Sequence, residues 1–155
     1  MKLNKLLLTG LVILCAAFFA FSSFNTHDSE EVKAVKAVIE KSYVNGAFNG
    51  LDSDAMRAGF HEDFAIFSAK GEEMSKYPIA VWAEGVAKRK AKPEFDAAKN
   101  VWTHKFVSVD VTGGAAAVKI ELSHDGKHVY TDYLSLLKFD SGWRIAAKVY
   151  HSHKE

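Results

Sequence analysis

Two charged residues lie inside segments that otherwise have the composition of β-strands. Asp132 lies in "YTDYLSLLKF" and Lys148 lies in "WRIAAKVYHS". Aspartate is depleted from strands because its side chain tends to bond to the nearby backbone. The two charges could bind a ligand, act in catalysis, or pair with each other on a solvated face. The face of the sheet to which each side chain points decides between these roles.

Histidines offer a second kind of chemistry. His61, in "GFHEDF", could act as a base beside Glu62 or Asp63, although such a residue more often makes a polar link between a helix and a strand. Two further pairs could each place two imidazoles near a metal: His124 with His128, and His151 with His153. Because neither pair has an evident third ligand, we predict no metal site and no cofactor. No Ser/His/Asp order, glycine-rich phosphate loop or paired-carboxylate pattern is evident, so we predict no catalytic residue.

The first 23 residues have the layout of a secretory signal peptide. Lys2 and Lys5 precede an apolar run from Leu6 to Phe21, and the small residues Ser22 and Ser23 follow it. The run is shorter than the ~20 residues of a membrane-spanning helix. We therefore predict that residues 1–23 are cleaved and that the chain is exported, periplasmic or secreted, without a membrane association afterwards. An uncleaved anchor is the alternative.

Cleavage would change the charge and the redox chemistry of the chain. The net charge would fall from +1 to −1 (+1 − 2), because Lys2 and Lys5 are lost. Cys15, the single cysteine, is lost as well, which excludes a disulfide framework, a thiol nucleophile and a zinc–thiolate site. The near-neutral charge and the lack of a basic cluster give no indication of nucleic-acid binding.

The remaining residues, 28–153, have the pattern of a single α+β domain. Apolar residues at helical spacing and capping residues predict three N-terminal helices, and glycine-containing turns separate strands that alternate in polarity. We expect the three helices to pack on one face of an antiparallel sheet. The predicted helices are residues 28–50, 51–64 and 77–92; the predicted strands are residues 64–75, 100–111, 115–124, 127–139 and 143–153.

The glycine turns predict the register of the hairpins and therefore the two faces of the sheet. A two-residue turn at Asp125-Gly126 would set Leu122 against Val129, and a three-residue turn at residues 140–142 would set Phe139 against Trp143. A single β-bulge would exchange the faces, because a shift of one residue turns every side chain over. The predicted core face is Val118, Ile120, Leu122, Val129, Tyr133, Leu137, Phe139, Trp143, Ile145 and Val149.

The opposite face would combine apolar side chains with opposite charges. Such a face is too apolar to be only solvated, and cross-strand charge pairs add at most ~1 kcal/mol. We therefore predict a homodimer through this outer face. Its residues would be Lys119, Tyr130, Asp132, Leu134, Lys148 and Tyr150.

Two stretches of the chain resemble a known family. "SYVNGAFNGLDSDAMRAGFHEDFAIFS" and "YTDYLSLLKFDSGWRIAAKVY" closely resemble the "putative lumazine-binding" family of the nuclear-transport-factor-2-like superfamily, over about residues 30–151. The resemblance implies a cone: a strongly curved antiparallel sheet wrapped round the helices, as in cystatin-like folds, with a pocket at its open end. It also implies a small, aromatic ligand and a dimer formed through the sheet.

Some members of the superfamily are enzymes, including ketosteroid isomerases, polyketide cyclases and epoxide hydrolases. The isomerases use an aspartate base, and the matching position here is Ser68, which cannot take a proton at neutral pH. Tyr43 matches the tyrosine of their first helix. A proton donor without its base argues against that chemistry.

We therefore expect an exported protein that binds a small apolar or aromatic molecule without chemistry. The polar positions of the predicted core face cluster at one end of the sheet, which indicates a pocket mouth. The predicted ligand-binding residues are Tyr43, Trp82, Thr131, Tyr133 and His151. Two alternatives remain: an enzyme with His61 or His151 as base, and a structural or partner-binding module whose cavity is filled by its own side chains.

Overall fold

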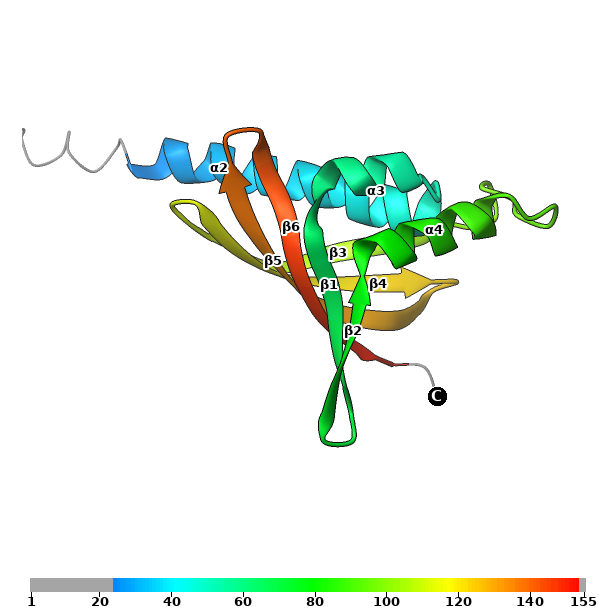
Figure 1. Ribbon diagram of the computed structural model, residues 1–155. Helices are drawn as coiled ribbons and strands as arrows, with labels where there is room; N and C mark the ends of the chain where they lie inside the picture. The colour runs from blue at the N-terminus through cyan, green and yellow to red at the C-terminus, as the bar shows by residue number, and fades with distance from the viewer. Residues whose placement is uncertain (1–23, 154–155) are drawn as a thin grey trace, which may run out of the picture.

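The computed structural model describes residues 24–153, so the predicted signal peptide lies outside the described residues. The chain begins with helices, forms a β-hairpin and one more helix, and ends in four consecutive strands (Figure 1). The helices are α2 (Phe24–Val38), which continues into the π-helix η1 (Ile39–Asn49), α3 (Ser53–Gly59) and α4 (Ile79–Lys90). The strands are β1 (Phe60–Lys70), β2 (Glu73–Pro78), β3 (Trp102–Thr112), β4 (Ala115–His124), β5 (Lys127–Phe139) and β6 (Gly142–Ser152).

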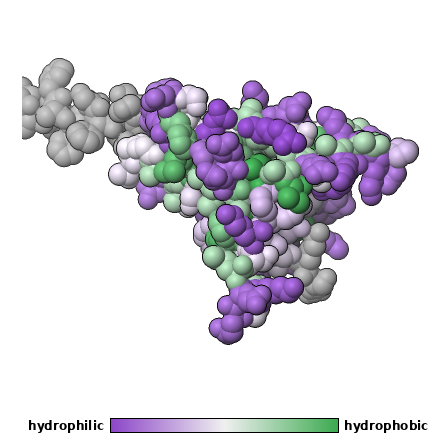
Figure 2. Space-filling model, in the orientation of Figure 1, coloured by the Kyte–Doolittle hydropathy of each residue, from purple (hydrophilic) through white to green (hydrophobic). Residues whose placement is uncertain are grey.

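The six strands form one curved, unclosed sheet in the order β2-β1-β6-β5-β4-β3. Neighbouring strands are antiparallel except β1 and β6, which are parallel. The helices cover one face of this sheet, while the β1–β2 hairpin projects away from them and ends in hydrophilic residues (Figures 1 and 2). The predicted α+β architecture is therefore confirmed. No helix within residues 24–153 has both the length and the apolar composition needed to cross a membrane.

Local sequence explains how the helices join. Asp52 caps α3, since its carboxylate accepts hydrogen bonds from the backbone N–H groups of Asp54 and Ala55, each at 3.0 Å. At the other end of α3, Gly59 lies against Ser42 of η1 so closely that a Cβ at residue 59 would overlap the serine side chain. The glycine therefore allows α3 to cross η1 in close contact, which fixes the π-helix against the start of β1.

The core lies between the helices and the covered face of the sheet. η1 contributes Ile39 and Tyr43, both fully buried, and α4 contributes Ala83 and Val86. Strands β4, β5 and β6 contribute Ile120, Leu122, Leu134, Leu136 and Ile145, all less than 2% exposed. Residues two apart share the covered face where a strand is regular, as Ile120 and Leu122 do in β4 and Leu134 and Leu136 do in β5.

The predicted register of β4 and β5 is correct only beside the turn. His124 lies opposite Lys127 and Ser123 opposite His128, as the two-residue turn predicts. The register then shifts by one residue, so that Leu122 lies opposite Tyr130 and not opposite Val129. This β-bulge turns Tyr130, Asp132 and Leu134 toward the helices.

A second bulge acts in the same way between β5 and β6. The turn there has two residues, not three, since Phe139 lies opposite Gly142 and Lys138 opposite Trp143. The register shifts between Ser135 and Leu136, and Lys148 then lies opposite Leu134 on the covered face. Trp143, Ile145 and Lys148 all point inward, although Lys148 is three residues after Ile145 and not two.

The two bulges exchange the predicted faces of β5 and of the second half of β6. Asp132 is 0% and Lys148 4% exposed, whereas Tyr133 and Val149, both predicted for the core, are 49% exposed. The predicted dimer face is therefore wrong for Tyr130, Asp132, Leu134, Lys148 and Tyr150, which lie on the face that the helices cover. Lys119 lies on the outer face, as predicted, where it is opposite Tyr133.

Candidate functional site

A buried charged cluster lies on the covered face, where the sheet meets η1. The Lys148 ammonium lies 2.9 Å from Asp132 Oδ1 and donates a hydrogen bond of 2.7 Å to the Tyr43 hydroxyl. The Tyr43 hydroxyl in turn donates to Asp132 Oδ2. Asp132 Oδ1 takes part in the cluster through its ion pair with Lys148.

Three elements that are distant in sequence position this cluster. Asp132 lies on β5, Lys148 on the neighbouring β6, and Tyr43 on η1. The β5–β6 bulge turns Lys148 inward, and the π-helix places Tyr43 above both charges. π-Helical segments are rare and often occur at functional sites.

Burial shifts the pKa values of Lys148 and Tyr43 in opposite directions. Burial lowers the pKa of Lys148, because the charged ammonium loses water; the nearby Asp132 carboxylate opposes this effect. Burial, followed by the charge of Asp132, raises the pKa of Tyr43 well above its usual value of 10.0. Tyr43 is therefore a neutral phenol at neutral pH and can donate its proton in a hydrogen bond to Asp132.

A buried ion pair of this kind is not an efficient way to stabilise a fold. The desolvation of two charges can exceed their mutual attraction, so that an apolar pair of similar size is often at least as stable. The cluster is therefore a candidate functional site, because perturbed titratable groups concentrate at such sites.

Aromatic rings surround the Lys148 ammonium. Five ring centroids lie between 4.9 and 6.0 Å from Nζ, within the range of cation–π attraction. The rings come from η1, α4, β5 and β6, so the packing of helices on the sheet creates the arrangement. They are Tyr43, Phe48, Trp82, Tyr130 and Tyr150.

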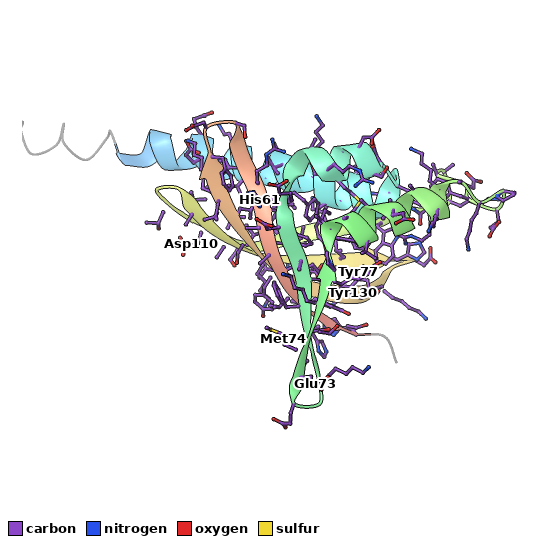
Figure 3. All side chains as sticks on the ribbon, in the orientation of Figure 1. His61, Glu73, Met74, Tyr77, Asp110 and Tyr130 are labelled. Atoms are coloured by element: carbon purple, nitrogen blue, oxygen red, sulfur yellow. The ribbon has the colours of Figure 1, made fainter. Side chains whose placement is uncertain are left out.

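A cavity of about 540 Å³ opens beside this cluster, between α4, η1 and the sheet. Lys148 lines it, as do four of the five rings, whereas Asp132 and Tyr43 lie behind Lys148. Ser68, Ser75 and Tyr77 of the β1–β2 hairpin and Gly85 and Arg89 of α4 also line it. Figure 3 shows Tyr77 and Tyr130 beneath α4, and Glu73 and Met74 near the tip of the hairpin. The volume is typical of pockets for small molecules.

The structure separates the five predicted ligand-binding residues. Trp82 lines the cavity, and Tyr43 packs against Trp82 with ring centroids 6.0 Å apart. The placement of Thr131, Tyr133 and His151 in the pocket is wrong, because none of them lines this cavity. The bulge at Val129 turns Thr131 and Tyr133 to the other face, and His151 lies opposite Thr131, beyond the β5–β6 bulge. That Trp82 and Tyr43 act on a ligand stays a prediction.

Thr131 instead belongs to a histidine cluster at the ends of β5 and β6. Its hydroxyl lies 3.1 Å from His128 Nε2 and 3.0 Å from His153 Nε2, and the His151 ring contacts that of His153. The described residues contain no group of three or more His, Cys, Asp or Glu side chains arranged to hold a metal ion.

His61 does not reach the cavity. Its ring stacks on Phe139 with centroids 4.9 Å apart, and its Nδ1 accepts a hydrogen bond of 3.2 Å from the backbone N–H of Asp63. Figure 3 places His61 away from Tyr77 and Tyr130. These contacts connect the start of β1 with the end of β5. Ser68, the residue at the isomerase base position, does line the cavity.

Sequence reasoning missed most of the wall of the cavity. A signal was present: Tyr130 and Asp132 are two apart, as are Lys148 and Tyr150, so each pair must share a strand face. Placing both pairs inward with Leu134 and Leu136 gives the observed site. The aromatic side chains of Phe48 and Tyr77, and Arg89, had no comparable signal, because their positions depend on tertiary packing.

Comparisons with known proteins show the family and the fold of the chain. A family model described as "Putative lumazine-binding" matches residues 30–151. Among the curated proteins, no match is found.

Several solved structures have the same fold. A nuclear-transport-factor-2-like protein of unknown function from Silicibacter pomeroyi is 25% identical, with a TM-score of 0.64, and the match covers 81% of this chain and 98% of that one. A similar protein from Shewanella baltica is 22% identical, with a TM-score of 0.62 and coverage of 86% and 99%. A cystatin-like domain of unknown function from Nostoc punctiforme is 14% identical, with a TM-score of 0.58 and coverage of 81% and 79%.

Proposed function

Since the chain belongs to the nuclear-transport-factor-2-like family described as "Putative lumazine-binding", we propose that it is an exported protein that binds a small aromatic or apolar molecule in the cavity beneath α4. The family supports ligand binding in general. Export rests on the predicted signal peptide in residues 1–23.

One observation carries this proposal: a cavity lined by Phe48, Trp82, Tyr130 and Tyr150 reaches a single buried polar group, the Lys148 ammonium. Pockets for small molecules combine mainly apolar and aromatic walls with a few fixed polar groups. The rings would stack on a flat ligand, and Lys148, held by Tyr43 and Asp132, would fix its orientation.

An enzyme is the second candidate, and the titratable cluster is the observation that favours it. Lys148, Asp132 and Tyr43 are all buried at or behind the cavity wall and could transfer a proton to or from a bound molecule. Binding without chemistry is preferred, because Asp132 and Tyr43 lie behind Lys148 and a ligand would meet the ammonium first.

Native mass spectrometry of the mature protein, purified from its own cell envelope, tests the binding function. We expect an added small mass on each chain. Gly85→Trp should remove this mass, because Gly85 lines the cavity and a Cβ there has no neighbour closer than the Tyr77 hydroxyl at 3.6 Å, so the indole can enter the empty space. Ala87→Trp, on the exposed side of the same helix, is the matched control and should keep it. A Gly85→Trp protein that retains the mass would contradict the site.

We also propose that the protein is a homodimer through the outer face of the sheet. With the corrected register, this face carries Val107, Tyr133, Leu137, Phe139 and Val149, each between 38% and 49% exposed. A second copy would cover these side chains. Val149→Lys should then convert the dimer to a monomer in light-scattering measurements; a wild-type monomer would contradict the proposal.

A further inference from the structure

We infer that the ligand of the cavity carries an acidic group that is ionised at neutral pH, and that this anion binds at Lys148; the ligand class is an aromatic acid. The inference rests on the proposed binding function and names the chemistry of its ligand.

The charges along the cavity wall have one sign. Lys148 and Arg89 line the cavity, and none of the described residues that line it is acidic. The carboxylate that balances Lys148 belongs to Asp132, which lies behind the ammonium and does not line the cavity. The Lys148–Asp132 pair is neutral as a whole, but its positive end faces the ligand space.

The ammonium group of Lys148 can make a further contact. An ammonium has three N–H donors. Among the described residues, the Lys148 Nζ atom contacts two oxygen atoms, the Tyr43 hydroxyl and Asp132 Oδ1. The third N–H is available to an acceptor in the cavity, and a charged acceptor would make the stronger bond.

The aromatic rings select against a cationic ligand. Rings arranged around a cation are a common way to bind an ammonium ligand. Here the ammonium of Lys148 itself lies among the rings. Its Nζ atom is 4.9 Å from the ring centroid of Tyr43 and 5.0 Å from that of Tyr150. A second cation would be repelled by Lys148, whereas a flat anion can stack on the outer rings and place its charge at Nζ.

Arg89 balances the charge that such a ligand brings. Because the Lys148–Asp132 pair is already neutral, a bound carboxylate adds one uncompensated negative charge. The Arg89 guanidinium, exposed at the cavity, is held by a hydrogen bond of 3.1 Å to the Ala47 carbonyl oxygen and supplies the matching positive charge. Its attraction should weaken with added salt, since exposed charges are screened.

Calorimetric titration with matched acids and amides tests the inference on the mature wild-type chain. The probes are benzoate, 2-naphthoate and indole-3-carboxylate, each against its own amide, which has a similar shape but no charge. We expect the best acid to bind about tenfold or more tightly than its amide at pH 7, as one charge-assisted hydrogen bond implies. Equal or tighter binding of the amides would overturn the inference and leave the proposed function standing. If no acid and no amide binds with a dissociation constant below about 1 mM, both the inference and the proposed binding function are overturned.

Two variants locate the preference. Lys148→Met combined with Asp132→Leu removes both buried charges together, and we expect the acid to lose its advantage while the amide affinity changes by less than about threefold. Arg89→Gln, at an exposed residue, keeps the measurement informative if the double variant does not fold: acid binding should weaken about threefold and lose part of its salt dependence. Lys88→Gln, on the same helix and paired with Glu84, is the control. It should change neither the affinity for the acid nor the salt dependence of binding. An unchanged acid preference in the double variant would overturn the placement of the anion at Lys148.

Discussion

At the scale of residues, the buried Lys148–Asp132 pair connects the fold to its proposed use. Both side chains are removed from water, and each depends on the other for compensation. Tyr43 completes the cluster by accepting from one charge and donating to the other. Such a cluster is sensitive to the loss of any single member.

Removing one charge should therefore cost more than removing both. We expect Lys148→Met to lower the free energy of unfolding by about 3–5 kcal/mol, because Asp132 stays buried without a counter-charge. Adding Asp132→Leu should restore most of this loss. Urea unfolding of the two variants measures the difference, and a double variant that is less stable than Lys148→Met alone would show that the charges are not coupled.

Tyr43→Phe should reduce stability in a pH-dependent way. The loss should be about 1–3 kcal/mol, because Asp132 Oδ2 loses its donor. The pKa of Tyr43 is raised in the folded state. Above pH 10 the unfolded phenol therefore releases its proton while the folded one retains it, so this stabilisation is complete below pH 10 and declines as the pH rises toward the folded pKa.

Urea unfolding of wild type and Tyr43→Phe at about pH 8 and about pH 11 measures this effect. The wild-type advantage should be smaller at the higher pH. An advantage that grows with pH would contradict the raised pKa.

At the scale of elements, two β-bulges decide which side chains meet. Each bulge adds one residue to one strand and reverses the faces beyond it. Leu134 and Leu137 lie on the same strand but are 1% and 46% exposed. Without the bulges, Leu137 would be buried and Leu134 exposed.

The two leucines therefore provide a matched test of the register. Leu134→Ala should lower the free energy of unfolding by about 2–5 kcal/mol, because it leaves a cavity in the core. Leu137→Ala should cost less than Leu134→Ala, since the Leu137 side chain lies half exposed on the outer face of the sheet and leaves no cavity in the core. Equal losses in chemical unfolding would indicate that the faces are assigned wrongly.

The contact of α3 with η1 gives a second test at this scale. Gly59→Ala should cost about 1–3 kcal/mol, because its Cβ would overlap Ser42. Gly85→Ala is the control: the nearest atom to its Cβ is 3.6 Å away, and alanine favours the helix by about 1 kcal/mol. If the two variants have the same thermal midpoint, the helices do not cross as closely as described.

The sequence predicted the elements better than their pairing. Helix periodicity, capping residues and the glycine turns predicted the helices and strands in the right order. The bulges at Val129 and between β5 and β6 had no local signature, because they follow from the curvature of a sheet that wraps round helices. Faces assigned by strict alternation were therefore wrong for Tyr133 and Val149, and right for Ile120 and Leu122.

At the scale of the whole molecule, the curved sheet and the helices enclose one end of the site and leave the other open. The cavity walls come from η1, β1, β2, α4, β5 and β6, so no short sequence motif could describe them. The resemblance to the family predicted a pocket at the open end of a cone. Trp82, one of the predicted ligand-binding residues, does line the cavity. The buried charged pair at the cavity was not predicted, because the strict alternation of the strands assigned Asp132 and Lys148 to the outer face.

The most direct measurement of the binding site is a calorimetric titration of 2-naphthoate into wild type, Gly85→Trp and Ala87→Trp. Wild type and Ala87→Trp should bind the probe with similar affinity, while Gly85→Trp should not bind it, because the indole would fill the cavity beneath α4. Binding by a folded Gly85→Trp protein with the affinity of the wild type would contradict the cavity as the ligand site.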